Sequence, residues 1–252
     1  MRLCVPIPCF FKGQDADFCQ AIRRIAALGY DAAETYRWKG LDLDEVKRTL
    51  DECGVELLSM CTTEFDLTSP DKRDAWLDGM KESCEAAKKL GARRLITQVG
   101  KDTGAPREQQ HASIVAGLKA GAPILDQYGI TMMIEPLNVL VNHPGYYLVS
   151  ALEAFDIVKE VGSPSVKVVY DIYHQQISEG NIIPTVTANL EHIAHLHGAG
   201  HPGRHELQYG ESNYRYIIDQ IDKAGYKGSL GLEYSPILDP IESLRLAREL
   251  FG

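Results

Sequence analysis

The feature that most constrains this chain is an alternation of short β-rich runs with helical segments, repeated eight times. A Gly follows the expected end of six helical segments, where a left-handed residue commonly closes a helix. The expected strands cover residues 3–7, 31–34, 56–60, 94–98, 131–135, 166–171, 193–197 and 229–234. The expected helices cover residues 15–28, 43–53, 72–90, 107–128, 150–161, 182–190, 214–224 and 241–250.

The length of the repeat favours one architecture. Eight units in 252 residues average about 31 residues each, close to the length of one βαβ unit, and no Ser-, Gly- or Pro-rich linker interrupts them. We therefore predict a single (β/α)8 barrel, the TIM-barrel architecture, as one α/β domain over residues 1–252. A doubly wound sheet is the alternative, but the first expected strand is not followed by a Gly-rich phosphate-binding turn.

The charge balance limits the partners of this chain. It has 35 acidic and 26 basic residues and a net charge of -9, whereas affinity for nucleic acid rests mostly on Lys and Arg. No apolar run approaches the ~18 residues that span a bilayer, and the first residues lack the pattern of a signal peptide. We expect a cytoplasmic protein that binds neither nucleic acid nor a membrane; a homo-oligomer is left open.

Four consecutive expected strands end in a residue that can bind a metal, namely Glu135, Asp171, His197 and Glu233. Active-site groups of such barrels come from the carboxyl ends of the strands. Period-2 alternation predicts that these four side chains share one phase and converge at the barrel mouth if that phase faces the interior. Helix capping or a solvated loop charge is the alternative for each acidic residue alone. Three carboxylates and one imidazole suit one Mn2+ or Mg2+ ion, and can hold Co2+ or Zn2+.

Segments of the second half resemble the hydroxypyruvate isomerase branch of the xylose-isomerase-like TIM-barrel superfamily. They are IEPLN, HPGYYL, YDIYHQQISEGN, HPGRHELQYGESNY and YKGSLGLEYSP, and they lie within residues 134–236. The resemblance implies a divalent metal on the four strand-end residues, with Glu135 and Glu233 also as acid and base. It also implies that His174 hydrogen-bonds a substrate oxygen; a His satisfied by loop backbone is the alternative.

This chain departs from that branch at two places. The branch tends to have Gln at the position of His197, and a Pro-Gly turn where Leu207 and Gln208 stand. A His at position 197 is familiar from ketose 3-epimerases, so an epimerase or a sugar dehydratase is an alternative on the same site. The segment NVLVNHPGYY lacks the Arg-x-x-Glu-like stretch of those epimerases, which favours an isomerase.

The chemistry that fits these groups is proton transfer at a carbon beside a carbonyl of a small hydroxy-carbonyl substrate. A divalent ion stabilises the enediolate that forms, and a carboxylate must collect the proton. A single base suits an aldose-ketose isomerase, whereas Glu135 and Glu233 on opposite faces of the substrate suit an epimerase. The sequence permits both.

Further residues are candidates for the pocket. Arg204 lies in a Gly-flanked loop and is expected to pair with a substrate carboxylate or phosphate, with a surface charge as the alternative. Glu206 is a further candidate for substrate binding, through orientation of Arg204 or His174. Residues 36–38, Tyr-Arg-Trp, follow the second strand and can form a wall of the pocket. His195 is expected to be an interior histidine rather than a ligand.

Two other classes of protein remain as distant alternatives. An endonuclease IV-like nuclease shares the barrel and the strand-end ligands, but it needs further histidines from the third and fourth strands, which here end in Met60-Cys61 and Gln98. A non-catalytic binding protein on a degenerate barrel would be expected to have lost some of the four ligands.

Overall fold

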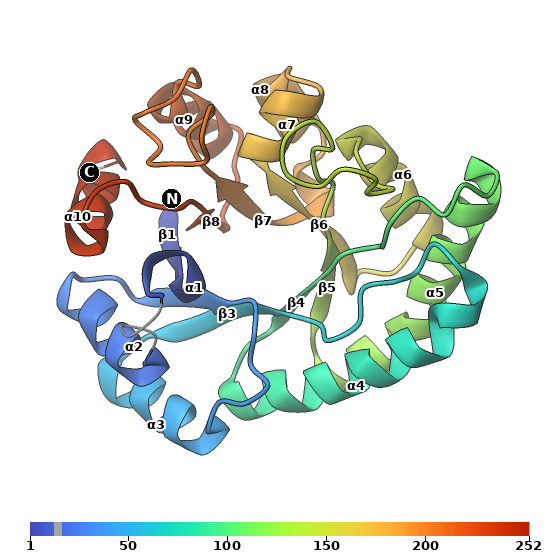
Figure 1. Cartoon of the computed structure of the whole chain (residues 1–252), viewed down its shortest axis with the longest axis horizontal. Helices are drawn as coiled ribbons and strands as arrows, with labels where there is room; N and C mark the ends of the chain where they lie inside the picture. Colours follow the sequence, from blue (N-terminus) through green and yellow to red (C-terminus); the bar gives the residue numbers. More distant parts are fainter. Residues whose placement is uncertain (13–16, 252) are drawn as a thin grey trace.

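A closed barrel of parallel strands forms the centre of the molecule in the computed structural model, which describes residues 1–12 and 17–251 (Figure 1). Each strand pairs with the next one along the chain, and β8 closes the barrel on β1, with Leu3 opposite Leu230. The predicted (β/α)8 barrel is confirmed. The strands are β1 Arg2–Pro6, β2 Ala32–Thr35, β3 Glu56–Cys61, β4 Arg94–Thr97, β5 Thr131–Ile134, β6 Val166–Asp171, β7 Ile193–Gly198 and β8 Ser229–Leu232.

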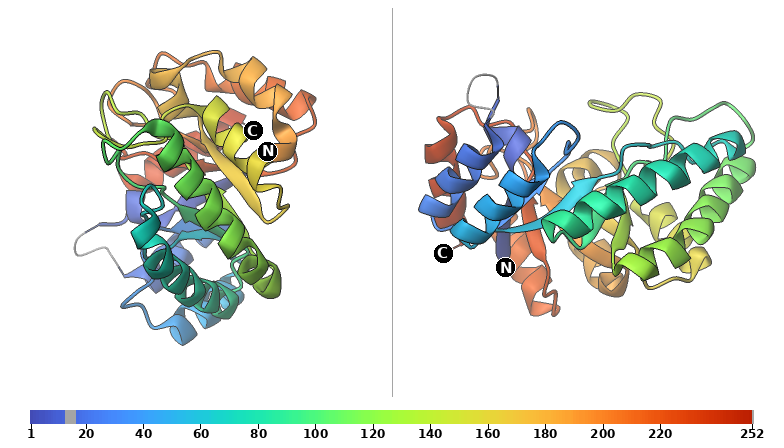
Figure 2. Two further views of the ribbon diagram at one scale, coloured as in Figure 1. Left: turned by 90° about the vertical axis from the view of Figure 1, so that its right-hand side faces the viewer. Right: turned by 90° about the horizontal axis from the view of Figure 1, so that it is seen from below.

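Helices surround the barrel as an outer ring, and the two chain ends lie near each other (Figures 1 and 2). The α-helices are α1 Ile7–Phe10, α2 Phe18–Ala27, α3 Leu43–Cys53, α4 Arg73–Leu90, α5 Arg107–Tyr128, α6 Ala151–Val161, α7 Ile172–Ser178, α8 Ile182–Ala188, α9 Tyr214–Lys223 and α10 Pro240–Phe251. The 3-10 turns are η2 Pro70–Lys72 and η3 Leu190–His192. The last helix is tied to the first βα unit, since the hydroxyl of Tyr30 donates to the carbonyl of Leu244 at 2.8 Å.

The helix boundaries follow the expected glycines. All six glycines predicted to follow helix ends have a positive φ, for example 64° at both Gly54 and Gly129, which are the C-cap residues of α3 and α5. At the other end, Asp42 caps α3 by accepting hydrogen bonds from the backbone N–H groups of Asp44 and Glu45, both at 3.1 Å. Local capping interactions therefore explain why the alternation of strands and helices can be predicted from the sequence.

All eight predicted strands are confirmed, with shifts at their ends. The expected strand 229–234 ends at Leu232, because the N–H of Glu233 donates to the carbonyl of Gly231 at 3.0 Å and turns the chain out of the strand. The expected strand 3–7 shifts to Arg2–Pro6, since the next residues form α1. The predicted start of a helix at residue 15 lies outside the described residues, and α2 begins at Phe18.

The structure adds two short helices that were not predicted, α1 and α7. α7 follows β6 directly, and the sequence pattern had placed only one helical segment, 182–190, between β6 and β7. That segment is shorter than expected: α8 ends at Ala188, and η3 follows it.

Apolar side chains fill the space between the barrel and the helices. Trp76 on α4, Tyr170 on β6 and Phe155 on α6 are among the largest buried side chains there. No helix in the described part of the chain is both long enough and apolar enough to cross a membrane.

Candidate metal centre and active site

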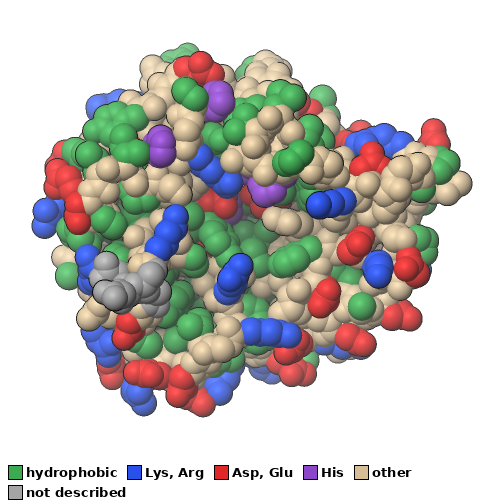
Figure 3. All heavy atoms as spheres, in the orientation of Figure 1, with side chains coloured by type: hydrophobic (Ala, Val, Ile, Leu, Met, Phe, Trp, Pro, Cys, Tyr) green, Lys and Arg blue, Asp and Glu red, His purple; other side chains and the backbone are tan. Residues whose placement is uncertain are grey.

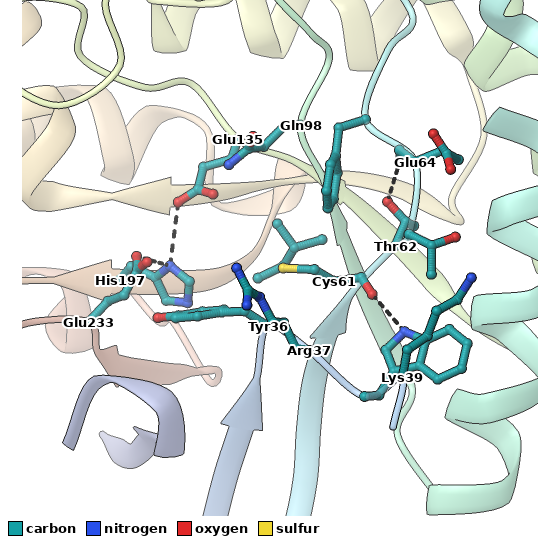
Figure 4. Close-up of a pocket in the computed structure, with 14 residues that line it drawn as sticks. Tyr36, Arg37, Lys39, Cys61, Thr62, Glu64, Gln98, Glu135, His197 and Glu233 are labelled. Carbon is teal, nitrogen blue, oxygen red and sulfur yellow. Dashed lines mark hydrogen bonds and ion pairs between the residues drawn. The ribbon is translucent and has the colours of Figure 1, made fainter. Parts of the chain in front are cut away.

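The four predicted ligands come together at the carboxyl ends of β5 to β8. Asp171 is the last residue of β6, His197 lies in β7, and Glu135 and Glu233 directly follow β5 and β8. One potential ligand atom from each of the four lies within 4.8 Å of the other three. Figure 4 shows Glu135, His197 and Glu233 turned toward one another. The prediction that these side chains converge at the barrel mouth is confirmed.

Each of the four residues presents a buried polar atom that has no hydrogen-bond partner. These atoms are Oε1 of Glu135, Oδ2 of Asp171, Nδ1 of His197 and Oε2 of Glu233. Nδ1 of His197 lies 2.9 Å from Oε2 of Glu233 and 3.5 Å from Oε1 of Glu135. Buried polar atoms are normally hydrogen-bonded, whereas these four lie close together in ion-pair contacts that lack hydrogen-bond geometry, so the cluster indicates a site for a bound group.

The carboxylate of Asp171 serves two roles through its two oxygens. Oδ1 accepts a hydrogen bond from the backbone N–H of Tyr173 at 2.7 Å and so caps the first turn of α7. Oδ2 faces the cluster without a partner. The helix-capping interpretation and the metal-ligand interpretation of this residue are therefore compatible.

In the metal-free protein two of the three carboxyl groups of the cluster have raised pKa values. Burial and the negative charge of Glu233 raise the pKa of Asp171 to about 7. Burial also raises the pKa of Glu135, with a further contribution from Glu233. Burial acts in the same direction on Glu233, but the positive charges of Arg204 and His197 outweigh it and hold its pKa below the usual value. Two carboxyl groups thus resist ionisation at a place where a divalent ion would favour it.

These residues fit a divalent metal ion. Their donor set is three carboxylates and one imidazole nitrogen, all buried or nearly so, with one free ligand atom each. That set suits a hard or borderline divalent ion.

Arg204 is held against the cluster rather than exposed as a free cation. Its Nη2 lies 3.0 Å from Oε1 of Glu233 and 3.7 Å from Oδ2 of Asp171. Its guanidinium also lies over the ring of Tyr173, 5.3 Å from the ring centre. The backbone of Arg204 has a φ of 58°, a conformation that costs a non-Gly residue free energy. In this structure Arg204 therefore pairs with Glu233, and its expected pairing with a substrate anion stays a prediction.

His174 is buried beside Asp171 and has one free ring nitrogen. Its Nδ1 accepts a hydrogen bond from the backbone N–H of Asn138 at 3.2 Å, so the ring proton of the neutral imidazole lies on Nε2. Nε2 has no hydrogen-bond partner and lies 3.5 Å from Oδ2 of Asp171. Burial, followed by the charge of Arg204, lowers the pKa of His174 well below its usual value and keeps the ring neutral. His174 therefore offers an N–H donor at the edge of the cluster.

Glu206 has a different partner from those expected. Its buried carboxylate accepts hydrogen bonds from the backbone N–H groups of Ile237 and Leu238, both at 3.2 Å. Neither Arg204 nor His174 is among its hydrogen-bond partners in the described part of the chain. Glu206 thus holds the loop that follows β8, and the expectation that it orients Arg204 or His174 is corrected.

A cavity of about 500 Å³ opens above the cluster. Glu135, His197 and Glu233 lie on its wall, and so do Tyr36, Arg37 and Trp38, as the sequence suggested. Figure 3 shows this face hollowed near its middle, with acidic and histidine side chains inside the hollow and Lys and Arg side chains around it.

Sequence reasoning missed Glu34. This residue lies in β2, is fully buried, and contacts both His195 and His197 with its carboxylate. The available signal was its position, since Glu34 ends the expected strand 31–34, and a charged group in a barrel strand needs a partner. His195 is confirmed as an interior histidine.

The fold and the site define a barrel enzyme with a carboxylate and histidine centre at the carboxyl ends of its strands. The family model of the xylose isomerase-like TIM barrel matches residues 22–250. The chain therefore belongs to this family.

Named relatives agree with this assignment. The hydroxypyruvate isomerase of Escherichia coli is 31% identical over 229 residues, which cover 87% of this chain and 88% of the relative. The 2-oxo-tetronate isomerase of Haemophilus influenzae is 29% identical over 231 residues, which cover 88% of this chain and 89% of the relative. The chain is thus an isomerase.

A solved structure has nearly the same fold. It is described as an AP endonuclease of family 2 from Brucella melitensis, and it superposes with a TM-score of 0.93 at 26% identity, over 98% of each chain.

Proposed function

We propose that this chain is a metal-dependent isomerase of a small hydroxy-carbonyl compound, hydroxypyruvate or a related keto sugar or sugar acid, with an enediolate intermediate. The observation that carries the proposal is the convergence of four buried, unpartnered ligand atoms beside a cavity of about 500 Å³. The names of the relatives, hydroxypyruvate isomerase and 2-oxo-tetronate isomerase, support this substrate class.

Glu135, Asp171, His197 and Glu233 would hold one divalent ion. Mn2+ or Mg2+ suits this oxygen-rich donor set best, and Co2+ or Zn2+ would be accepted as substitutes. When bound, such an ion would supply a positive charge that polarises a carbonyl and stabilises the negative charge that develops on its oxygen.

The glutamates move the proton. Isomerisation removes a proton from the hydroxyl-bearing carbon and delivers one to the former carbonyl carbon. In the metal-free protein Glu135 accepts a proton more readily than Glu233, because burial raises the pKa of Glu135, whereas the ion pair with Arg204 disfavours protonation of Glu233. We therefore assign the first proton abstraction to Glu135 and place Glu233 as the second acid-base group.

Two neighbouring side chains position the reacting groups. His174 is neutral and carries its proton on Nε2, so it can donate a hydrogen bond to a substrate oxygen. Arg204 holds the carboxylate of Glu233 in one orientation through Nη2, while its Nε donates to the backbone carbonyl of Glu233 at 3.3 Å.

The cavity favours a substrate with an anionic end. Arg37 lines it, and no carboxylate among the described residues pairs with the Arg37 guanidinium. The other basic side chain of this wall, Lys39, is paired with Glu82 at 2.8 Å. Since Arg204 is paired with Glu233, Arg37 is the side chain best placed to bind the carboxylate of a keto acid.

Epimerisation and dehydration are the alternatives on the same groups. Glu135 and Glu233 reach the cluster from β5 and β8, so a planar enediolate between them could meet a carboxylate on each face. The nuclease alternative is weaker, because neither candidate metal cluster of the described residues contains a His from β3 or β4.

Proton exchange with solvent tests the proposal. The protein, loaded with Mg2+, is incubated with hydroxypyruvate or with a neutral ketose in deuterated water, and NMR follows each C–H signal. We expect loss of the signal at the carbon beside the carbonyl, together with formation of the isomeric aldehyde. Exchange with inversion of a centre would favour an epimerase, and no exchange on any of these compounds would contradict the enediolate mechanism.

A further inference from the structure

A buried carboxylate lies between two histidines inside the barrel, below the proposed metal centre. Oε1 of Glu34 is 2.6 Å from Nε2 of His195, and Oε2 of Glu34 is 2.9 Å from Nε2 of His197. All three side chains are almost completely buried. Glu34 lies in β2, whereas both histidines lie in β7, so the contact crosses the interior of the barrel.

Chemistry determines the direction of these hydrogen bonds. An ionised carboxylate is only an acceptor, so both imidazoles must donate to it through Nε2–H. Nδ1 of His195 lies 3.0 Å from the hydroxyl of Ser229, which can donate to it. A continuous chain of donors thus runs from Ser229 through His195 to Glu34, and His197 donates to Glu34 from the other side.

The hydrogen bond from Nε2 of His197 to Glu34 determines what Nδ1 of the same ring can do. Burial alone would lower the pKa of His197, but the carboxylates of Glu233 and Glu34 raise it well above its usual value, so in the metal-free protein the ring is cationic and Nδ1 directs its proton at Glu233. In the neutral ring that a metal requires, the proton on Nε2 stays with Glu34, and the lone pair lies on Nδ1, the atom that faces Glu135 and Glu233. A metal-binding imidazole needs that arrangement, with the far nitrogen held by a carboxylate.

The backbone above these three side chains is adapted to them. A Cβ on Gly231 would lie 2.6 Å from Cδ2 of His197, 2.8 Å from Oε1 of Glu34 and 3.1 Å from Nε2 of His195. Only a glycine lets β8 pass this closely, so strand β8 restricts the movement of all three groups.

From this geometry we infer that Glu34 is a positioning residue that selects the tautomer and orientation of His197 for metal binding, with His195 and Ser229 holding Glu34 in place. The inference rests on the proposed function, because it requires His197 to be a metal ligand. It means that metal binding also depends on Glu34 in β2, which is not one of the four proposed ligands.

Metal affinity tests the inference in variants of the full-length protein. Mn2+ binding to Glu34→Gln and Glu34→Met is measured by calorimetric titration, with circular dichroism of the metal-free protein as the check of folding. Loss of such a partner typically weakens metal binding by about 10- to 100-fold. Gln can still accept one hydrogen bond, so we expect it at the lower end of that range and Met at the upper end. The absorption spectrum of the Co2+ form should change in both variants.

The matched control is Thr97→Val. Thr97 is buried on β4, and its hydroxyl accepts a hydrogen bond from the indole N–H of Trp76 at 3.0 Å, away from the histidines. This variant also removes a buried polar group, and we expect it to bind Mn2+ as the wild type does. Folded Glu34 variants with wild-type Mn2+ affinity and an unchanged Co2+ spectrum would overturn the inference.

A measurement on the wild type covers the case in which the Glu34 variants do not fold. NMR of protein with 15N-labelled histidines, loaded with diamagnetic Zn2+, reports which ring nitrogen carries the proton. We expect Nε2–H for both His195 and His197, and a proton on Nδ1 of His197 would overturn the inference. Wild-type protein that binds no divalent ion would instead overturn the proposed function on which it rests.

Discussion

Nη2 of Arg204 lies 3.0 Å from Oε1 of Glu233. Because of this ion pair, the pKa values of Glu135 and Glu233 are shifted in opposite directions. The positive charge of Arg204 contributes to the low pKa of Glu233, whereas the pKa of Glu135 is raised by burial. Two carboxylates that occupy one cluster are thus suited to different steps of proton transfer.

The first prediction concerns this ion pair. Arg204→Ala removes a positive charge next to Glu233, a proposed metal ligand, so we expect Mn2+ affinity to be kept or increased. Turnover should fall by roughly 10-fold or more, because Glu233 loses the group that orients it. Steady-state kinetics and calorimetric titration measure the two effects. Arg204→Lys serves as the control that restores the charge without the forked geometry. Unchanged turnover in the Ala variant would show that the ion pair with Glu233 plays no part in catalysis.

The second prediction concerns the acid-base groups. Glu135→Gln and Glu233→Gln keep the side-chain shape and one oxygen ligand but lose basicity. Both variants should fold, retain part of their metal affinity, and lose turnover by about 10²-fold or more. If Glu135 is the base of an isomerase, its variant should also stop exchange of the substrate proton with solvent, as followed by NMR in deuterated water.

An epimerase gives a different pattern in the same experiment. One variant should then still exchange the substrate proton while it fails to invert the centre, because the other face keeps its base. Near-normal turnover of both variants with metal bound would show that the carboxylates are ligands alone.

The third prediction is the pH dependence of metal binding and stability. Asp171 has a pKa of about 7 in the metal-free protein, so protons compete with the ion below that pH. The apparent Kd for Mn2+ should rise by about tenfold per pH unit below pH 7 for each proton displaced. The folded-state pKa lies above the unfolded value, so ionised Asp171 destabilises the fold, and this effect disappears as the pH falls from about 7 toward about 4.

Two measurements test the expected effects of Asp171 ionisation on metal affinity and on stability. Calorimetric titration at pH 6, 7 and 8 gives the Kd for Mn2+, and thermal unfolding of the metal-free protein between pH 5 and 8 gives the stability. We expect the ionisation of Asp171 to contribute a fall in the metal-free Tm toward higher pH. A Kd that stays constant between pH 6 and 8 would show that no proton is displaced on binding.

The fourth prediction concerns the anionic end of the substrate. Arg37→Ala should raise the KM for hydroxypyruvate by about 10- to 150-fold, the loss that corresponds to a charge-assisted hydrogen bond of roughly 1.5 to 3 kcal/mol. The KM for a neutral ketose should change little. Lys39→Ala is the control from the same wall, because Lys39 is paired with Glu82. Equal effects on charged and neutral substrates would contradict a carboxylate-binding role.

Patterns over a few residues of the sequence are enough to predict most strand and helix positions of this barrel. Strand and helix positions follow from hydrophobic periodicity and from the glycines after the helices, which act over a few residues. The four proposed ligands follow as well, because each lies at, or directly beside, the carboxyl end of one of four consecutive strands, and the carboxyl ends of parallel strands meet on one face of a barrel. The sequence by itself therefore determined the barrel and the four converging residues.

Only the tertiary structure decided the partners of the charged groups around them. Glu34 and His197 are 163 residues apart, and Glu206 and Ile237 are 31 apart, distances over which no local period acts. Arg204 lies in a loop whose path, with a φ of 58°, turns its guanidinium toward Glu233. The direction of a side chain beyond the end of a strand depends on the packed loop that carries it. For that reason the four proposed ligands can be predicted from the sequence, whereas the groups that orient them, Glu34 and Arg204, can be identified only in the folded barrel.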